Sequence, residues 1–92
     1  LEAHKAVKHD LKKISPQTAR EIVNKVFPRI IQNPFVGISL VGHLRGYFKF
    51  VFHFKGVSYR IIYQVYPLQK LVFIIAIGPR EKFYEKLLNR ID

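Results

Sequence analysis

The sequence predicts an α+β fold, in which an N-terminal helical hairpin packs on a small antiparallel sheet and a C-terminal helix follows. Three observations predict it. Apolar residues in the first third of the chain recur every three or four positions, as in amphipathic helices. Residues 47–54 alternate strictly between phenylalanine and other residue types, as in a strand. Two more β-rich runs follow, and a final helical pattern closes the chain. The helices are expected on one face of the sheet.

Two helices are expected before the strands. The first covers His4–Ile14. The second begins with Ser15 as the N-cap and Pro16 at the first helical position, where the missing N–H of proline does no harm. Pro28 lies inside this second helix and predicts a kink or an early end, because proline removes a hydrogen bond and clashes with the preceding turn. Asn33-Pro34 ends the segment, so the two helices are expected to form a hairpin.

Two predicted strands bring basic side chains to one face. Tyr47–Phe54 has its four phenylalanines on one face, and the other face holds Tyr47, Lys49, Val51 and His53. In the next run, Tyr59–Tyr66, one face holds Arg60, Ile62 and Gln64. The phenylalanine face is expected to pack against the helices. Lys49, His53 and Arg60 are therefore expected to share the opposite face.

A third strand and a last helix complete the pattern. Leu71–Ile77 is apolar at every position, as a central strand buried on both faces would be. Gly78-Pro79 breaks it, and the final helix covers Glu81–Ile91. Two sets of side chains are available to pack this helix: Phe83, Leu87 and Ile91, or Tyr84 and Leu88. Arg80 and Tyr84 follow the third strand directly, so they are expected near the face of Arg60.

Composition limits the class of protein. Residues 1–92 are long enough for one domain, and 49% of them are hydrophobic. The absence of cysteine excludes disulfides, thiol catalysis and cysteine–zinc sites, and it fits a cytoplasmic chain. No apolar run approaches the roughly 20 residues of a membrane span. The net charge of +10 indicates a polyanionic partner: nucleic acid, an acidic protein or an anionic membrane surface.

Four short motifs occur in a characteristic order. They are Ala6-Val7-Lys8-His9-Asp10-Leu11-Lys12-Lys13-Ile14, Leu44-Arg45-Gly46-Tyr47, Gly56-Val57-Ser58-Tyr59-Arg60-Ile61-Ile62-Tyr63 and Ile77-Gly78-Pro79-Arg80-Glu81-Lys82-Phe83-Tyr84. Together they resemble the RelE-type toxins of the RelE/ParE toxin–antitoxin superfamily over nearly the whole chain. Members of that superfamily usually begin with a strand before the first helix, and only Leu1-Glu2-Ala3 is left for it here. The strand is expected to be a stub, or the sequence begins late; if the strand is missing, one sheet edge is open.

The resemblance implies a toxin that enters the ribosomal A site and cuts messenger RNA. In such toxins the 2′-hydroxyl of the RNA attacks the adjacent phosphate and leaves a 2′,3′-cyclic phosphate, without a metal or a small-molecule cofactor. It also implies a cognate antitoxin as partner. By position, Arg60 and Arg80 match the two phosphate-binding arginines, Tyr84 matches the C-terminal tyrosine, and Lys55 matches a basic position beside the turn.

The predicted strand Tyr47–Phe54 departs from RelE. RelE has lysines seven and nine residues before the Tyr-Arg arginine, where this chain has His53 and Val51. Because histidine exchanges protons near neutral pH, His53 is a candidate base or acid. Arg60, Arg80, Tyr84 and His53 are thus the candidate catalytic residues. The candidate phosphate-binding residues are Lys49, Lys55 and Arg45.

Each assignment has a structural alternative. The arginines could form ordinary surface ion pairs with Glu81 or Glu85. His53 could be a strand histidine bonded to a neighbour, and Tyr84 could pack the last helix on the sheet. Two other functions also stay open. One is a ParE-like toxin that inhibits DNA gyrase, and the other is a protein that binds RNA or the ribosome without cutting.

Overall fold

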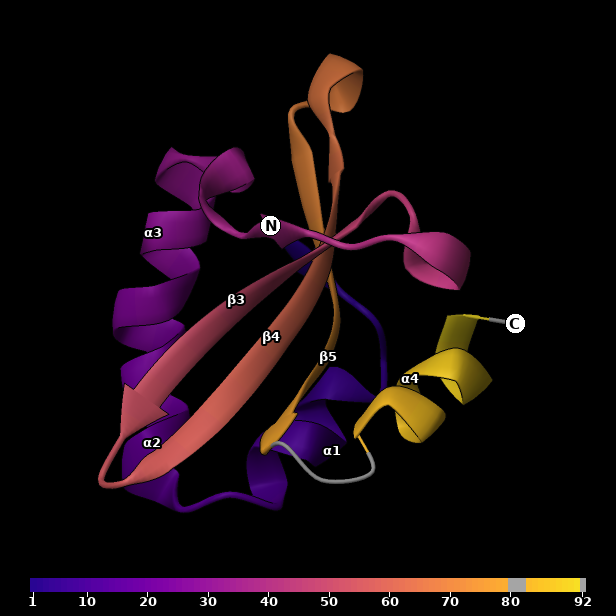
Figure 1. Cartoon of the computed structure of the whole chain (residues 1–92). Helices are drawn as coiled ribbons and strands as arrows, with labels where there is room; N and C mark the ends of the chain where they lie inside the picture. Colours follow the sequence, from indigo (N-terminus) through magenta and orange to yellow (C-terminus); the bar gives the residue numbers. More distant parts are fainter. Residues whose placement is uncertain (80–82, 92) are drawn as a thin grey trace.

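The computed structural model describes residues 1–79 and 83–91, with only the backbone for Tyr84. The chain forms a five-stranded sheet with the order β1-β5-β4-β3-β2 (Figure 1). The strands are β1 (Glu2–Ala3), β2 (Ile38–Ser39), β3 (Tyr47–Phe54), β4 (Val57–Tyr66) and β5 (Leu71–Pro79). β1 runs parallel to β5, and all other pairs are antiparallel. The α+β class is confirmed, while the expectation of a wholly antiparallel sheet is wrong.

The two outer strands of the sheet, β1 and β2, show no strand pattern in the sequence. β1 and β2 have two residues each, which is too short for an alternating pattern to show. β1, at the start of the given sequence, has two residues, and both expectations for the N-terminus stay open. It pairs with Phe73 and Ile74, and no other described strand lies along that edge of β5.

The helical part contains more segments than expected. The helices are α1 (Val7–Lys12), α2 (Pro16–Glu21) and α3 (Phe27–Gln32), and a π-helical turn, η1 (Ile22–Val26), joins α2 to α3. The backbone N–H of Thr18 donates to Ser15 Oγ over 3.1 Å, which is the predicted N-cap. Pro28 is the second residue of α3, just after the π-helical turn, so the predicted disturbance is a change of hydrogen-bonding pattern within a continuous helical segment.

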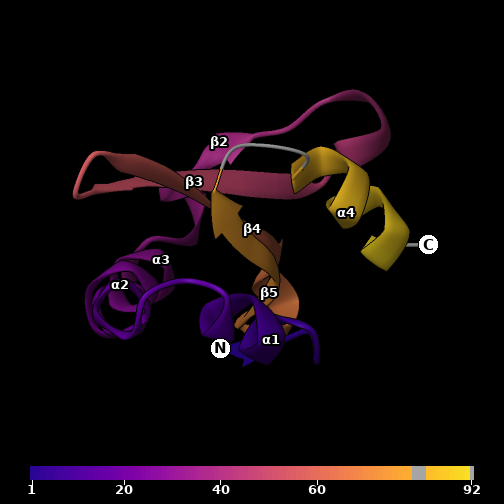
Figure 2. The ribbon, with the colours of Figure 1, turned by 90° about the horizontal axis from the view of Figure 1, so that it is seen from below.

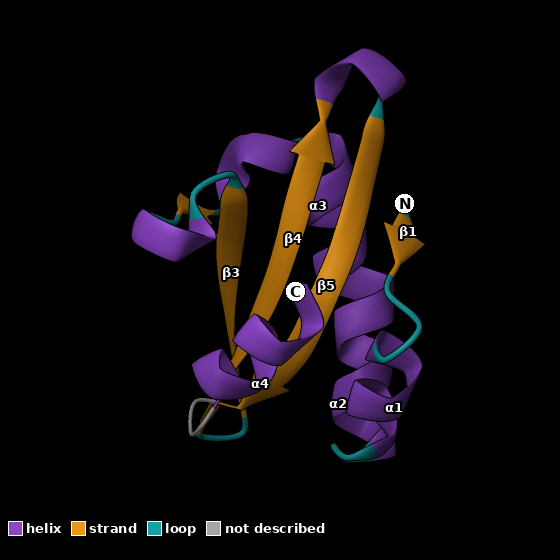
Figure 3. Ribbon diagram, turned by 90° about the vertical axis from the view of Figure 1, so that its right-hand side faces the viewer, coloured by secondary structure: helices purple, strands orange, loops and turns teal. Residues whose placement is uncertain are grey.

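Helices cover both faces of the sheet. Figure 2 shows α1, α2 and α3 on one side, and Figure 3 shows α4 (Phe83–Ile91) in front of the opposite side. The core below α1–α3 includes Ile61, Tyr63 and the partly buried phenylalanines of β3. A second core packs Phe83 and Leu87 of α4 against Ile62 and residues of β5. The expectation that helices lie on one face is therefore wrong, and β5 is apolar throughout because both of its faces are covered.

Local geometry fixes the relative position of the strands and α4. Lys55 and Gly56 both have positive φ, of 50° and 79°, and form the two-residue turn between β3 and β4. Ile75 is an extra residue in β5, because Ile62 pairs with Ala76 while Tyr63 pairs with Ile74. α4 approaches the sheet closely where β5 ends, since a Cβ on Gly78 would lie 3.1 Å from the Phe83 ring.

Candidate functional site

Arg60 lies in the middle of the sheet, and part of its charged group has no hydrogen-bond partner among the described residues. It belongs to β4, opposite Val51 of β3 on one side and Gly78 of β5 on the other. The Nε and Nη1 atoms of its guanidinium are buried, and no described residue accepts a hydrogen bond from them. A buried guanidinium nitrogen without an acceptor is costly, because the group has left water and gained nothing in return. Glu81, one of the two ion-pair partners considered for Arg60, lies outside the described residues, and no described ion pair joins Arg60 to Glu85.

Two more sequence-predicted residues share this face. Lys49 pairs with Ile62 and His53 pairs with Ser58, so both are diagonal neighbours of Arg60 across β3 and β4. The register confirms that Lys49, His53 and Arg60 lie on one face. His53 Nδ1 is 2.7 Å from Ser58 Oγ, which holds the ring and leaves Nε2 as the outer nitrogen. We call these three side chains, with Ser58, the Arg60 face.

Lys55 and Arg45 lie elsewhere. Lys55 Nζ donates to Gln17 Oε1 of α2 over 2.5 Å, and it lies 5.7 Å from the centre of the Phe54 ring. These contacts direct the Lys55 side chain toward the face of the sheet that α1–α3 cover, away from the Arg60 face. Arg45 is exposed at the far end of β3 from His53, where its backbone N–H closes a 3-10 turn on Gly42.

The last two predicted residues are only partly covered by the structure. Arg80 lies outside the described residues. Tyr84 is in α4, the helix that covers β5 on the side of the Arg60 face, and its side chain is outside the described set (Figure 3). Between the two packing sets expected for this helix, Phe83 and Leu87 are the buried ones, and Leu88 is exposed. The roles of all these residues stay predictions.

One buried charge, on Asp10, is a feature that the sequence patterns did not predict. Asp10 of α1 is 1% exposed, and it accepts hydrogen bonds from Lys86 Nζ at 2.7 Å and from the backbone N–H of Ile77 at 3.0 Å. Both terminal nitrogens of Arg90 also donate to it. Burial alone would raise the pKa of Asp10, but the hydrogen bonds from Arg90, Lys86 and Ile77 lower the pKa below its ordinary value. The only signal was an acid at helical spacing from Val7, on the apolar face of α1.

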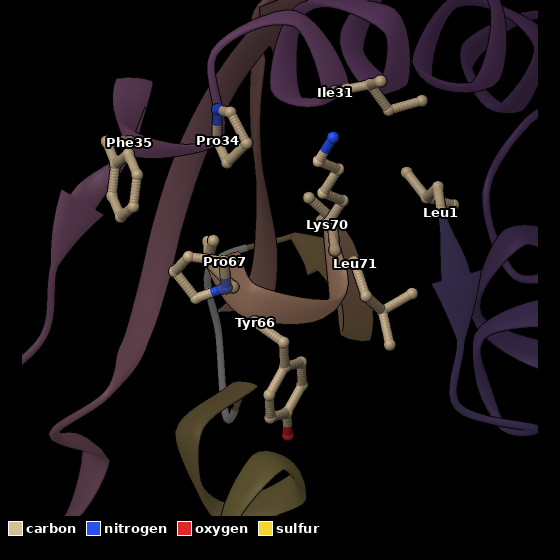
Figure 4. A pocket seen from close by; sticks show the side chains of 10 residues that line it. Leu1, Ile31, Pro34, Phe35, Tyr66, Pro67, Lys70 and Leu71 are labelled. Carbon is tan, nitrogen blue, oxygen red and sulfur yellow. The ribbon is translucent and has the colours of Figure 1, made fainter.

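Hollows open at two places beside β5. An apolar one of about 260 Å³ opens beside the β4–β5 turn, with Lys70 among the labelled residues that line it (Figure 4). It is lined by Leu1, Ile31, Pro34, Phe35, Val65, Tyr66, Pro67, Lys70, Leu71 and Val72. A second, of about 380 Å³, lies where α1, the end of β5 and α4 meet, beside Asp10 and Phe83. Among the described helices, none combines the length and the apolar character that crossing a membrane requires.

Comparison with known proteins decides the family. Residues 1–88 match the model of the ParE-like toxin of type II bacterial toxin–antitoxin systems. The chain belongs to this family. No significant match to the ParE-like toxin was found among curated protein sequences.

The ParE-like toxin also resembles solved structures of RelE toxins. A chain of the RelBE2 toxin–antitoxin complex of Mycobacterium tuberculosis has 25% identity and a TM-score of 0.72, over 86% of this chain and 94% of that one. A chain of the intact Escherichia coli RelBE complex has 22% identity and a TM-score of 0.68, over 88% and 95%. A free E. coli RelE with two arginines mutated has 19% identity and a TM-score of 0.74, over 99% and 95%. The two E. coli likenesses concern the fold alone.

Proposed function

We propose that this ParE-like toxin is a ribosome-dependent endoribonuclease that cuts messenger RNA without a metal. One observation carries the proposal: the buried Nε and Nη1 of Arg60 have no acceptor among the described residues. Folding tolerates such a group more readily when a ligand supplies the missing acceptor. A phosphate offers acceptor oxygens in the geometry of the guanidinium fork. Lys49 and His53 flank the same position, so the face joins phosphate binding to a group that can move protons.

The chemistry follows from the residues of that face. The RNA 2′-oxygen forms a bond to phosphorus while the bond from phosphorus to the 5′-oxygen breaks, and the products are a 2′,3′-cyclic phosphate and a free 5′-hydroxyl. His53 takes the 2′-hydroxyl proton through Nε2, and its Nδ1 is held by Ser58. Arg60 donates to the oxygens of the pentacovalent phosphorane, where negative charge grows. Lys49 binds a neighbouring phosphate, and Arg80 and Tyr84 supply the second guanidinium and the acid for the 5′-oxygen.

The test is primer extension on messenger RNA bound to ribosomes. The wild-type protein is expected to produce stops inside codons, and Arg60→Ala and Arg80→Ala are expected to lower the rate about 10²–10³-fold, by analogy with the loss of one oxyanion-hole donor. Arg29→Ala is the matched control. It removes the same charge from the other face, where Arg29 lies 5.2 Å from the Phe50 ring centre. Unchanged cleavage by both Arg60→Ala and Arg80→Ala would refute the proposed site.

A second function is favoured by the family match itself, since the matching model is named for ParE. In this alternative the protein inhibits DNA gyrase by binding it. A gyrase supercoiling assay alongside the translation assay separates the two. A third alternative, binding of RNA or the ribosome without cleavage, rests on Val51, an apolar residue opposite Arg60. Protection of ribosome-bound message without any stop inside codons would establish it.

The expected protein partner is a cognate antitoxin, and the expected compartment is the cytoplasm. Two observations support the partner. The family is defined by toxin–antitoxin systems, and similar chains were solved in complexes with antitoxins. The charge of +10 favours an acidic antitoxin segment. Co-expression of the toxin with the neighbouring reading frame, followed by co-purification, tests this proposal directly.

A further inference from the structure

We infer that Asp10 is a positioning residue, which holds α4 on the sheet and so sets the place of Tyr84 relative to the Arg60 face. The inference rests on the proposed function for its catalytic consequence, while its structural part stands alone. Asp10 is on α1, which covers one face of the sheet, and α4 covers the opposite face (Figures 2 and 3). A single carboxylate therefore joins the two layers around the edge of β5.

The unpaired edge of β5 makes this connection possible. β1 ends at its pairing with Ile74, so beyond that point no described strand pairs with this edge of β5, while β4 pairs with the other edge. Asp10 Oδ2 accepts the N–H of Ile77 at 3.0 Å, and Arg90 Nη1 donates to the carbonyl oxygen of Ile75 at 3.2 Å. Two side chains thus satisfy backbone groups that a longer strand would have paired.

On α4, two cations one helical turn apart converge on the same carboxylate. Arg90 donates from Nη1 to Oδ2 and from Nη2 to Oδ1, over 2.5 and 2.6 Å, and Lys86 Nζ donates to Oδ1 over 2.7 Å. The Asp10 side chain is 0% exposed and that of Arg90 10%. The bidentate pair of Arg90 with Asp10 is shielded from water and depends on direction. It therefore opposes both the rotation of α4 and its detachment from the sheet.

The contacts of α4 with the rest of the protein determine its position and rotation, because the helix is not stable alone. Its nine residues are too few for a stable isolated helix. Phe83 and Leu87 anchor one side of the helix in the core that it forms with Ile62 and β5. The contacts with Asp10 anchor Lys86 and Arg90. Tyr84 lies within this segment, next to Phe83, so the position of its backbone depends on both anchors. Loss of Asp10 is expected to move Tyr84 and to leave the Arg60 face in place.

Hydrogen exchange followed by NMR tests the structural part. In Asp10→Asn, the exchange of α4 amides is expected to accelerate on the order of 100-fold, because one partner of a buried charge pair is lost. Amides of β3 and β4 are expected to change much less. The control is Glu21→Gln, which removes an exposed pair with Lys25 at 3.0 Å and is expected to leave α4 unchanged. Equal acceleration in α4, β3 and β4 would overturn the inference, because it would show a contribution to global stability alone.

Lys86→Gln gives a second test if Asp10→Asn does not fold. Lys86 is 34% exposed, so its loss is milder, and α4 exchange is expected to rise about tenfold. In ribosome-dependent cleavage, kcat is expected to fall about tenfold with KM within about twofold, since RNA binding by the Arg60 face is intact. Unchanged α4 exchange in Lys86→Gln, or an effect confined to KM, would overturn the inference. If the wild type does not cleave RNA, the proposed function fails, while the exchange data still decide the role of Asp10.

Discussion

Replacement of Arg60 by methionine should make this protein more stable and less active. Methionine has a similar length and fills irregular space, but it carries no charge to bury. In the wild type, Nε and Nη1 of Arg60 are buried without an acceptor among the described residues. Each buried polar group left unsatisfied costs about 1–3 kcal/mol. Because Arg60 as a whole is only half-buried, one such cost, and not two, is counted for the two atoms together. We expect Arg60→Met to raise the free energy of unfolding by about 1–3 kcal/mol.

Arg90→Met is the matched control for this prediction. Arg90 is also largely buried, but it is paired with Asp10 through both terminal nitrogens. Its removal leaves a buried carboxylate with fewer partners, which typically costs about 3–5 kcal/mol. Two arginine-to-methionine changes in one small domain, one in β4 and one in α4, are therefore expected to shift stability in opposite directions.

Thermal and urea unfolding, followed by circular dichroism, measure both effects. For a domain of this size, 1 kcal/mol corresponds to roughly 4–8 °C in Tm. Arg60→Met is expected to melt above the wild type and to lose mRNA cleavage about 10²–10³-fold. A lower Tm for Arg60→Met than for the wild type would refute the reasoning, because it would mean that the Arg60 charge is already satisfied within the folded protein.

Three more predictions follow from single contacts. Gly37→Ala is expected to lower the free energy of unfolding by about 1–3 kcal/mol in urea titrations, because the added Cβ would lie 2.5 Å from the buried Tyr63 Oη; unchanged stability would show that the loop moves freely. Because the pKa of Asp10 is lowered in the fold, its stabilisation is complete above the ordinary carboxyl pKa and disappears as the pH falls through the folded value. The free energy of unfolding should thus fall less between pH 7 and pH 3 in Asp10→Asn than in the wild type. An equal fall in the two proteins would contradict this. His53→Ala is expected to slow cleavage about 10²-fold and Ser58→Ala less than about tenfold, in single-turnover assays; a larger effect of Ser58→Ala would reverse their roles.

Local patterns were sufficient for the central part of the sheet. The alternation of β3 follows from the two-residue period of a strand, so it assigned each side chain to a face before any partner was known. The short turn at Lys55 and Gly56 then aligned β3 with β4 and brought Lys49 and His53 to Arg60. The N-cap at Ser15 was also readable, because it depends on residues within one turn of helix.

The tertiary structure decided everything that depends on distant residues. The burial of Phe83 and Leu87 against Ile62 and β5 determines which side of the sheet α4 occupies. The sequence of the helix alone does not indicate which face it covers. The Asp10 contacts join residues 67 to 80 positions apart. The sequence by itself determined which side chains share a strand face, since that is fixed by backbone geometry between neighbours. Only the folded chain decided which charges find partners, because burial and pairing depend on segments that meet in space.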